Sequence, residues 1–269
     1  MSFEFHGSPK LKFDHQFINA TTFVLPFIKE GGFTPEKGKF VLEIGCGEGG
    51  VLKAFTDLGC STLGVDLSVN RIQDANDLMK NEVKSGQATF ITKNVYDSDF
   101  LEKYAGKFDL IILKDTIEHI PEQEKFIPYL TRFLKPGAFV FFGYPPWSMP
   151  FGGHQQVCKS KLASKLPYYH LLPYSLFKAF LRMCGESEQT IKDLIEVKDT
   201  GISTWRFERI LKTTPLNITK RTFFLLNPIY RYKFNWSFAP IKQWRPIYYL
   251  PGIRDFITMC TYYMVQLPK

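Results

Sequence analysis

Short apolar runs alternate with helical spacings along the first half of the chain. Residues 13–30 carry apolar side chains at helical spacing, and Gly31 ends this stretch. Five short apolar segments follow, and each is typical of a strand buried in a parallel sheet. Strands are expected at 39–44, 62–65, 88–92, 108–113 and 138–142, with helices at 51–58, 69–84 and 122–134.

The regular alternation ends after the fifth strand. Residues 144–200 are rich in Pro, Tyr and Lys, which predicts an inserted cap. A helix is expected at 204–211, and two late strands at 218–226 and 256–266. No crossover helix separates these strands, which favours an antiparallel pair. The predicted fold is α/β: a doubly wound, mostly parallel, seven-stranded, Rossmann-like sheet with an antiparallel edge strand and an inserted substrate cap.

Composition and charge narrow the class of protein. A hydrophobic fraction of 45% and a charged fraction of 22% in 269 residues are ordinary for a globular protein. The formal net charge of +8 suits an anionic partner such as a phosphate, a nucleic acid or a membrane surface, and is equally compatible with a simple aid to solubility. The five cysteines are scattered without a Cys-x-x-Cys pair, which indicates a reducing compartment. Since the N-terminus lacks a signal-peptide pattern and no uncharged apolar stretch reaches membrane-spanning length, a cytoplasmic enzyme is expected.

The segment Val41 to Gly50 carries the most specific pattern. A strand runs into a glycine-rich turn that opens a helix, and glycine lets a ligand approach the backbone closely. Asp66 lies 21 positions after Gly45, at the end of the next strand. A carboxylate at this place can accept both hydroxyls of a ribose. The pattern therefore predicts a nucleoside-containing cofactor.

Over residues 38–143 the sequence resembles the class I S-adenosylmethionine-dependent methyltransferases. The turn at 43–49, the Gly64-Val65-Asp66 strand end, the segment 108–121 and the Lys135-Pro136-Gly137 turn correspond to the family's motifs. The resemblance implies that S-adenosylmethionine is the cofactor. It places the methionine portion on the turn, the ammonium group on the strand acid, the ribose on Asp66 and the adenine on the loop after the third strand. The implied binding residues are Glu43, Gly45, Cys46, Gly47, Gly49, Asp66, Leu67, Asn94, Val95 and Lys114.

Asn94 stands where the family usually carries an Asp, and its amide oxygen can still accept a hydrogen bond. The main alternative is an NAD-dependent dehydrogenase, because Gly45-x-Gly47-x-x-Gly50 also fits the dinucleotide fingerprint. The acid at Glu43 and the absence of a second nucleotide-binding half argue against it. The resemblance divides the chain into an N-terminal helical cover (1–35), a cofactor-binding core (36–145), an inserted cap (146–202) and a C-terminal helix with edge strands (203–269).

A group of polar residues at the sheet's carboxyl edge suggests acceptor chemistry. Asp115 and Glu118 follow the fourth strand at a spacing of one helical turn, and His119 is adjacent. His154 follows the fifth strand, so it is expected at the same crevice. The four side chains together suit a divalent metal, Mg²⁺ or similar. The arrangement resembles the acid-x-x-Glu-His motif of small-RNA 2′-O-methyltransferases and ubiquinone-biosynthesis O-methyltransferases, although Asp115 replaces their longer Glu. Without a metal, His154 or His119 is the expected general base.

The methyl acceptor is only loosely indicated. The segments 159–200 and 230–254 interleave aromatic side chains with Lys and Arg. Such a surface could stack rings and neutralise phosphate, or it could be an aromatic core with a basic rim. No RNA-binding module is recognisable, so a hydroxyl of a small metabolite or of a glycan or lipid precursor is favoured over an amine and over RNA. A non-catalytic cofactor-binding protein is the alternative of a different class.

Overall fold

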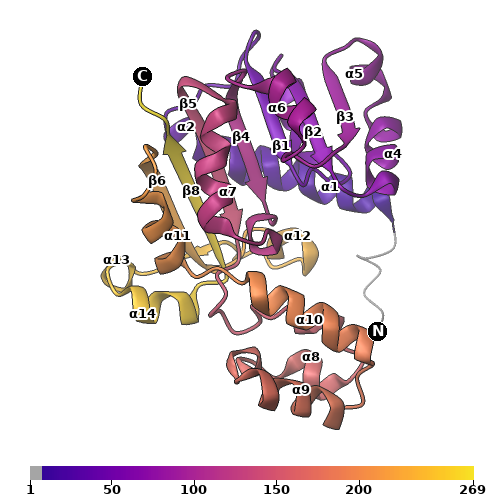
Figure 1. Ribbon diagram of the computed structural model, residues 1–269, viewed down its shortest axis with the longest axis vertical. Helices are drawn as coiled ribbons and strands as arrows, with labels where there is room; N and C mark the ends of the chain where they lie inside the picture. Colours follow the sequence, from indigo (N-terminus) through magenta and orange to yellow (C-terminus); the bar gives the residue numbers. More distant parts are fainter. Residues whose placement is uncertain (1–7) are drawn as a thin grey trace.

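The computed structural model describes residues 8–269, and every structural statement below concerns these residues. Eight strands form one sheet in the order β3-β2-β1-β4-β5-β8-β6-β7 (Figure 1). The first five are parallel and the last three add antiparallel pairs, so the predicted α/β, mostly parallel architecture is confirmed. The strands are β1 Phe40–Ile44, β2 Ser61–Asp66, β3 Ala88–Thr92, β4 Phe108–Lys114, β5 Leu134–Tyr144, β6 Asn217–Leu226, β7 Ile241–Lys242 and β8 Cys260–Gln266.

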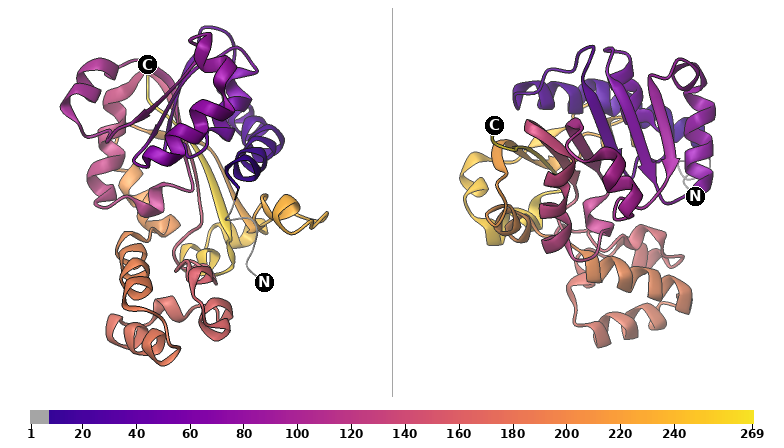
Figure 2. Two further views of the ribbon diagram at one scale, coloured as in Figure 1. Left: turned by 90° about the vertical axis from the view of Figure 1, so that its right-hand side faces the viewer. Right: turned by 45° about the horizontal axis from the view of Figure 1, so that its top comes forward.

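Helices cover both faces of the sheet (Figure 2). One face packs against α1 Pro9–Asn19, a π-helical turn Ala20–Val24, α2 Leu25–Glu30, α3 Gly50–Thr56, α4 Val69–Leu78 and α5 Lys80–Lys84. The other face packs against α6 Ser98–Tyr104, α7 Gln123–Leu130 and α11 Thr204–Leu211. The predicted helix over 13–30 is therefore confirmed as a nearly continuous element, although its first part begins at Pro9. The first seven residues of the predicted N-terminal cover lie outside the described residues.

Strand β4 shows why the sequence forms a two-sided core. Leu110 and Ile112 point into the core beneath α1 to α4, whereas Ile111 and Leu113 point into the core beneath α6, α7 and α11. All four side chains are fully buried. Burying each of them contributes roughly 1.5–3 kcal/mol, which accounts for an apolar run without polar alternation.

Several predicted boundaries were wrong. The sheet has eight strands rather than seven because the two-residue strand β7 adds an edge. Strand β5 begins at Leu134, and the Lys-Pro-Gly turn is an irregularity within it, since the pairing shifts between Phe108 and Leu110. The antiparallel pair of late strands is confirmed, but β8 begins at Cys260 because residues 255–257 form a 3₁₀ turn. It lies inside the sheet, between β5 and β6.

The helical predictions show similar local differences. The helix predicted over 69–84 is interrupted at Met79, which separates α4 from α5. The helix predicted over 122–134 ends at Leu130 and continues as a 3₁₀ turn. Helix α6 was not predicted, and neither were three short helices between β6 and β8: α12 Tyr230–Lys233, α13 Arg245–Tyr248 and α14 Pro251–Arg254.

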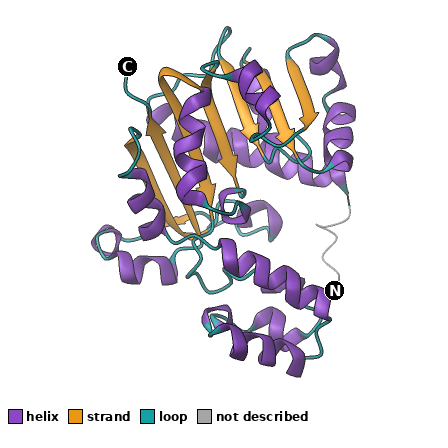
Figure 3. Cartoon of the chain, in the orientation of Figure 1, coloured by secondary structure: helices purple, strands orange, loops and turns teal. Residues whose placement is uncertain are grey.

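The segment after β5 forms a helical group beyond the carboxyl ends of the parallel strands (Figures 1 and 3). It contains α8 Lys161–Lys165, α9 Tyr174–Met183 and α10 Glu188–Thr200, which share a small core of their own. We call this group, residues 155–200, the cap. Two hydrogen bonds tie its last residue to the sheet edge: Thr200 Oγ1 donates to the Glu118 carbonyl at 2.7 Å, and Gln123 Nε2 donates to the Thr200 carbonyl at 2.5 Å.

Nowhere in residues 8–269 is there a helix whose length and apolar character would let it cross a lipid bilayer.

Candidate functional site

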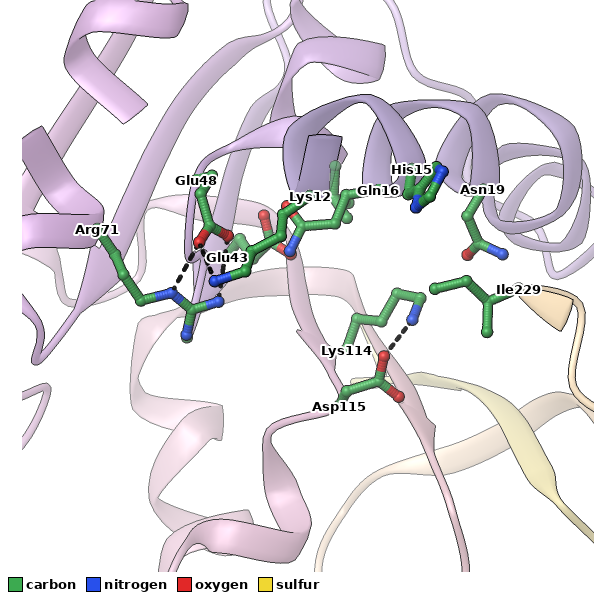
Figure 4. Close-up of a pocket in the computed structure, with 12 residues that line it drawn as sticks. Lys12, His15, Gln16, Asn19, Glu43, Glu48, Arg71, Lys114, Asp115 and Ile229 are labelled. Carbon is green, nitrogen blue, oxygen red and sulfur yellow. Dashed lines mark hydrogen bonds and ion pairs between the residues drawn. The ribbon is translucent and has the colours of Figure 1, made fainter. Parts of the chain in front are cut away.

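A cavity of about 220 Å³ lies between helix α1 and the carboxyl ends of β1 and β4 (Figure 4). Ligands bind at this edge in open α/β sheets, because the strand order reverses there between β1 and β4. Three of the predicted cofactor-binding residues, Glu43, Gly45 and Lys114, line this cavity. Its remaining wall is formed by Lys12, His15, Gln16, Asn19, Glu48, Val51, Arg71, Asp115 and Ile229.

The turn after β1 depends on glycine for two reasons. Gly45 and Gly47 have φ values of 73° and 52°, in the left-handed region that L side chains rarely adopt. A Cβ on Gly45 would stand 2.6 Å from Thr116 Oγ1, and one on Gly47 would stand 2.5 Å from Arg71 Nη2. Side chains at either position would therefore displace the loop after β4 or Arg71.

Hydrogen bonds fix the turn to the end of β2. The N–H groups of Gly45 and Cys46 donate to the Val65 carbonyl at 2.7 and 3.1 Å. The Asp66 carboxylate accepts from the Gly47 N–H at 3.0 Å and from the Ser68 N–H at 2.9 Å. Because the N–H groups of Gly45 and Cys46 are already bonded, the turn lets a ligand approach its backbone closely but offers no hydrogen-bond donor from these two residues. The two hydrogen bonds to Asp66 hold its carboxylate in one orientation. Each carboxylate oxygen retains capacity for another donor.

Glu43 fits a cationic ligand group. Its side chain is 2% exposed, and Oε2 has no hydrogen-bond partner within residues 8–269. Burial raises the pKa of this carboxyl well above its ordinary value, and the charge of Lys114 opposes the increase. Because an unpartnered buried acceptor is costly, a ligand ammonium that donates to Oε2 would relieve the cost. The residues present therefore fit the methionine portion of S-adenosylmethionine.

Helix α1 contributes cavity residues that the sequence analysis missed. Gln16 Oε1 accepts a hydrogen bond from the Gly50 N–H at 3.3 Å, which holds α1 over the start of α3. Lys12 Nζ lies 3.7 Å from the buried Glu48 carboxylate. The helical spacing of positions 12, 16 and 19 does not distinguish them in the sequence, because α1 also carries Lys10, Asp14 and His15.

Arg71 on α4 was also missed. Its Nη2 lies 3.2 Å from Glu48 Oε2, and its Nη1 lies 3.7 Å from Asp66 Oδ2. The guanidinium therefore links the glycine turn to Asp66, the acid predicted to bind the ribose. No pattern at the end of a helix marks such a role, so only the packing of α4 against the turn reveals it.

The other predicted cofactor residues lie on the loops after β2 and β3. Leu67 follows Asp66 and is 73% exposed. Val95 is buried, whereas Asn94 is exposed and its Oδ1 accepts from the Tyr96 N–H at 3.0 Å. Because β2 and β3 are adjacent parallel strands with Asp66 opposite Thr92, the loops that follow them lie at the same edge of the sheet. Their contact with adenine stays a prediction.

The structure brings together three of the four residues predicted to bind a metal. Potential ligand atoms of Glu118, His119 and His154 all lie within 4.8 Å of one another. The two imidazole rings pack edge to face with centroids 4.9 Å apart. We call these three residues the Glu-His-His cluster. Asp115 is not a member: it adopts a φ of 52°, and its carboxylate forms an ion pair with Lys114.

Burial controls the proton affinities in the Glu-His-His cluster. Glu118 is 5% exposed with Oε2 unpartnered among the described atoms, and burial followed by the charge of Asp115 raises its pKa well above the ordinary value. Desolvation and then the neighbouring His119 lower the pKa of His154 to about 4. Desolvation also lowers the pKa of His119. At neutral pH both imidazoles are therefore neutral, as a metal ligand or a proton acceptor must be.

Comparisons with known proteins agree with this geometry. The family described as "Methyltransferase domain" matches residues 16–183, more than half of the chain. The ubiquinone biosynthesis O-methyltransferase of Coxiella burnetii is 35% identical over 106 residues, which is 39% of this chain and 43% of that protein. The chain therefore matches less than half the length of such curated relatives.

Solved structures share the fold. Haemonchus contortus phosphoethanolamine N-methyltransferase 2, in complex with phosphomonomethylethanolamine and S-adenosylhomocysteine, has a TM-score of 0.56 at 18% identity, and the match covers 99% of this chain and 60% of that one. Geranyl diphosphate C-methyltransferase from Streptomyces coelicolor, in complex with Mg²⁺, geranyl diphosphate and S-adenosylhomocysteine, has a TM-score of 0.56 at 14% identity, with coverages of 91% and 79%. At such identities the likeness concerns the fold alone.

Proposed function

Because the chain belongs to the methyltransferase-domain family of S-adenosylmethionine-dependent enzymes, we propose that it methylates a hydroxyl group of a small molecule. The proposed acceptor is a metabolite or a glycan or lipid precursor. Family membership removes the dehydrogenase alternative raised by the glycine pattern. The relatives named for ubiquinone biosynthesis support a hydroxylated acceptor, but they share only part of their length with this chain.

The Glu-His-His cluster carries this proposal. A hydroxyl must lose its proton as it attacks a methyl group, whereas an amine that is already neutral needs no base to begin the attack. The cluster offers a buried carboxylate and two neutral imidazoles at the carboxyl edge of the sheet. The cluster lies near the cofactor cavity, because Asp115 lines the cavity and its charge raises the pKa of both Glu118 and His154.

The cofactor cavity supports the other half of the reaction. When bound, S-adenosylmethionine supplies a methyl carbon that its sulfonium activates. Glu43 would accept hydrogen bonds from the ammonium group and Asp66 from the ribose hydroxyls. The turn at Gly45 and Gly47 would lie against the cofactor, which positions the methyl group and excludes water.

Two versions of the proton transfer are compatible with the cluster. Glu118, His119 and His154 offer one oxygen and two nitrogens, a donor set that suits a first-row divalent ion or Mg²⁺ with added waters. A bound divalent ion supplies Lewis acidity that lowers the pKa of a coordinated hydroxyl. Without an ion, His154 takes the proton directly. Asp115 has no part in either version.

The test is release of S-adenosylhomocysteine from matched acceptors, for example a catechol and the corresponding aromatic diamine, with and without EDTA. We expect release with the diol, and loss of it in His154→Ala. Gln156→Ala, an exposed change in the same loop, is the matched control and should leave release unchanged. Release with the diamine alone, or full activity of His154→Ala on the diol, would contradict the proposal. Cofactor binding without release from any acceptor would favour a non-catalytic binding protein.

A further inference from the structure

The basic charge of the protein is concentrated in its C-terminal quarter. Residues 209–254 contain nine Lys and Arg and no Asp or Glu. Over 209–269 there are ten basic residues and one acidic residue, so the remainder of the chain has no net positive charge. The single acid, Asp255, is buried and bonds to Thr204. The whole net charge of +8 therefore comes from the strands and short helices at one end of the sheet.

Four of these basic residues surround one surface hollow. Lys220 and Arg221 on β6, Lys242 on β7 and Arg245 on α13 line a cavity of about 580 Å³, together with Tyr248 and Tyr249. Lys220 and Arg221 pair with Glu30 and Glu208. By contrast, Lys242 and Arg245 are exposed, and neither forms an ion pair with any residue in 8–269. The hollow thus presents two cations outside any ion pair of the described residues at the edge of the sheet, although the charge of Lys242 also acts on Glu30.

Large apolar side chains project beside this hollow. Ten of the 23 exposed large apolar side chains of the described chain lie within residues 234–257, less than a tenth of the sequence. Trp244 and Tyr249 are each 75% exposed, Ile253 is 56% exposed and Leu250 is 49% exposed. These four flank or belong to α13 and α14, which project from the molecule at the end opposite α5 (Figure 1). We call them, with Lys242 and Arg245, the aromatic-basic surface.

A buried arginine holds this surface in place. Arg254 is 1% exposed, and its guanidinium contacts Glu208 at 2.9 Å, Thr204 Oγ1 at 2.8 Å and the Tyr248 carbonyl at 3.0 Å. The segment therefore directs a charged side chain inward and apolar ones outward, the reverse of the usual arrangement. The contacts of Arg254 thus join the segment that carries the exposed aromatics to α11.

We propose that the aromatic-basic surface docks the protein on an anionic phospholipid membrane surface. Lys242 and Arg245 would face lipid phosphates, and Trp244, Tyr249, Leu250 and Ile253 would enter the interface between headgroups and acyl chains. Basic residues attract anionic leaflets, and Trp and Tyr prefer this interfacial region. The unpaired basic residues and the exposed apolar side chains lie on the same elements. This combination favours a lipid surface over a purely polar polyanion such as RNA. The inference is independent of the acceptor proposed above.

Co-sedimentation with vesicles tests the proposal. We expect the full chain to bind vesicles of equal parts phosphatidylcholine and phosphatidylglycerol, to bind pure phosphatidylcholine weakly, and to dissociate as NaCl rises. The double reversal Lys242→Glu/Arg245→Glu should weaken binding by about tenfold or more. The matched control, Lys80→Glu/Lys84→Glu, changes the net charge equally on α5 at the other end of the sheet and should bind like the wild type. Equal loss in both pairs, or none in either, would overturn the assignment.

Tryptophan fluorescence gives a second readout that does not depend on charge reversal. Insertion of Trp244 should shift the emission to shorter wavelength when anionic vesicles are added, and Trp244→Phe should remove most of the shift while still sedimenting with them. An unchanged shift in Trp244→Phe would place the contact elsewhere and overturn the proposal. Binding to a single-stranded RNA oligonucleotide but not to vesicles, measured by fluorescence anisotropy, would overturn it as well. Unaltered circular dichroism spectra establish that each variant is folded.

Discussion

Glu43 and Glu118 are alike in isolation and different in their neighbours. Both are buried glutamates at the carboxyl edge of the sheet, both have an unpartnered Oε2 within the described chain, and burial raises the pKa of both carboxyls. For Glu43, inside β1, the larger charge effects come from Lys114 and Arg71, which oppose its raised pKa, and smaller ones from Asp66 and Asp115 add to it. For Glu118, in a turn beside two neutral imidazoles, the larger charge effect comes from Asp115, which raises its pKa further, and Lys114 opposes it less.

The difference separates binding from chemistry. A buried carboxyl whose strongest charged neighbours are cations is suited to bind a ligand cation, whose charge lowers the cost of ionisation. A carboxylate next to another acid and two imidazoles is suited to share a proton or a metal ion. We therefore propose that Glu43 serves the cofactor and Glu118 the acceptor, and each assignment is open to a separate test.

The largest effect is expected from Glu118→Gln. Replacing the carboxyl group of the Glu-His-His cluster with an amide should lower kcat on a hydroxyl acceptor by roughly 10²–10⁴-fold, the usual range for losing proton-transfer catalysis. The affinity for S-adenosylmethionine should stay within about twofold of the wild type, since Glu118 does not line the cofactor cavity. Steady-state kinetics and calorimetry measure the two quantities. Glu122→Gln, an exposed glutamate four residues away, is the control and should change neither.

The converse change, Glu43→Gln, should weaken S-adenosylmethionine binding by about 10–100-fold. A charge-assisted hydrogen bond contributes roughly 1.5–3 kcal/mol, and the amide cannot replace the charge. At saturating cofactor the kcat should recover to within a few-fold of the wild type. If Glu43→Gln instead lowers kcat as strongly as Glu118→Gln does, the division between the two glutamates fails.

Stability in the absence of ligands should change by a smaller amount. Burial raises both pKa values above those of the unfolded chain, so the folded chain holds more protons between them. Its stability accordingly falls as pH rises through that interval and remains low above it. Each Glu→Gln variant escapes this loss and should melt a few degrees above the wild type at about pH 8, with the gap closing near pH 4. Differential scanning calorimetry at several pH values measures this, and saturating cofactor should abolish the gain for Glu43→Gln only.

The smallest expected change concerns His154. Its pKa is lowered to about 4 by burial and by His119, so its imidazole should remain neutral throughout the physiological range. An NMR titration of metal-free protein should show the ring-proton resonances of His154 nearly constant between roughly pH 5.5 and 8, since an ordinary histidine titrates near 6.5. A midpoint near 6.5 would mean that the ring is solvated and competes poorly for a metal at acid pH.

Some of the site was predictable because it is local. Gly45, Gly47, Glu43 and Asp66 lie in one strand–turn–helix–strand unit, whose geometry follows from the residues within it. His119 and His154 were predicted to meet because the carboxyl ends of adjacent parallel strands meet at one edge, and their rings do pack together. The doubly wound sheet was predictable for the same reason, from strands and helices in regular alternation.

The remainder depends on contacts that no local pattern encodes. Lys12 and Gln16 reach the cavity only because α1 packs across the glycine turn. Asp115 has the right spacing for a metal ligand, but a left-handed backbone and the nearby Lys114 redirect its carboxylate. The helices α12 to α14 have four residues each, which is too short for a periodic apolar pattern, and α14 ends at the buried Arg254.

We expect the two hydrogen bonds at Thr200 to affect the order of product release. They join the end of the cap to the backbone of Glu118 and to Gln123, and neither reaches the cofactor cavity. An outward hinge motion of α10 would therefore displace the backbone at Glu118, next to the proposed proton acceptors, while the contacts around the cofactor cavity stay in place. The methylated product would then depart first and the spent cofactor second, a release order that product-inhibition patterns distinguish from random exit.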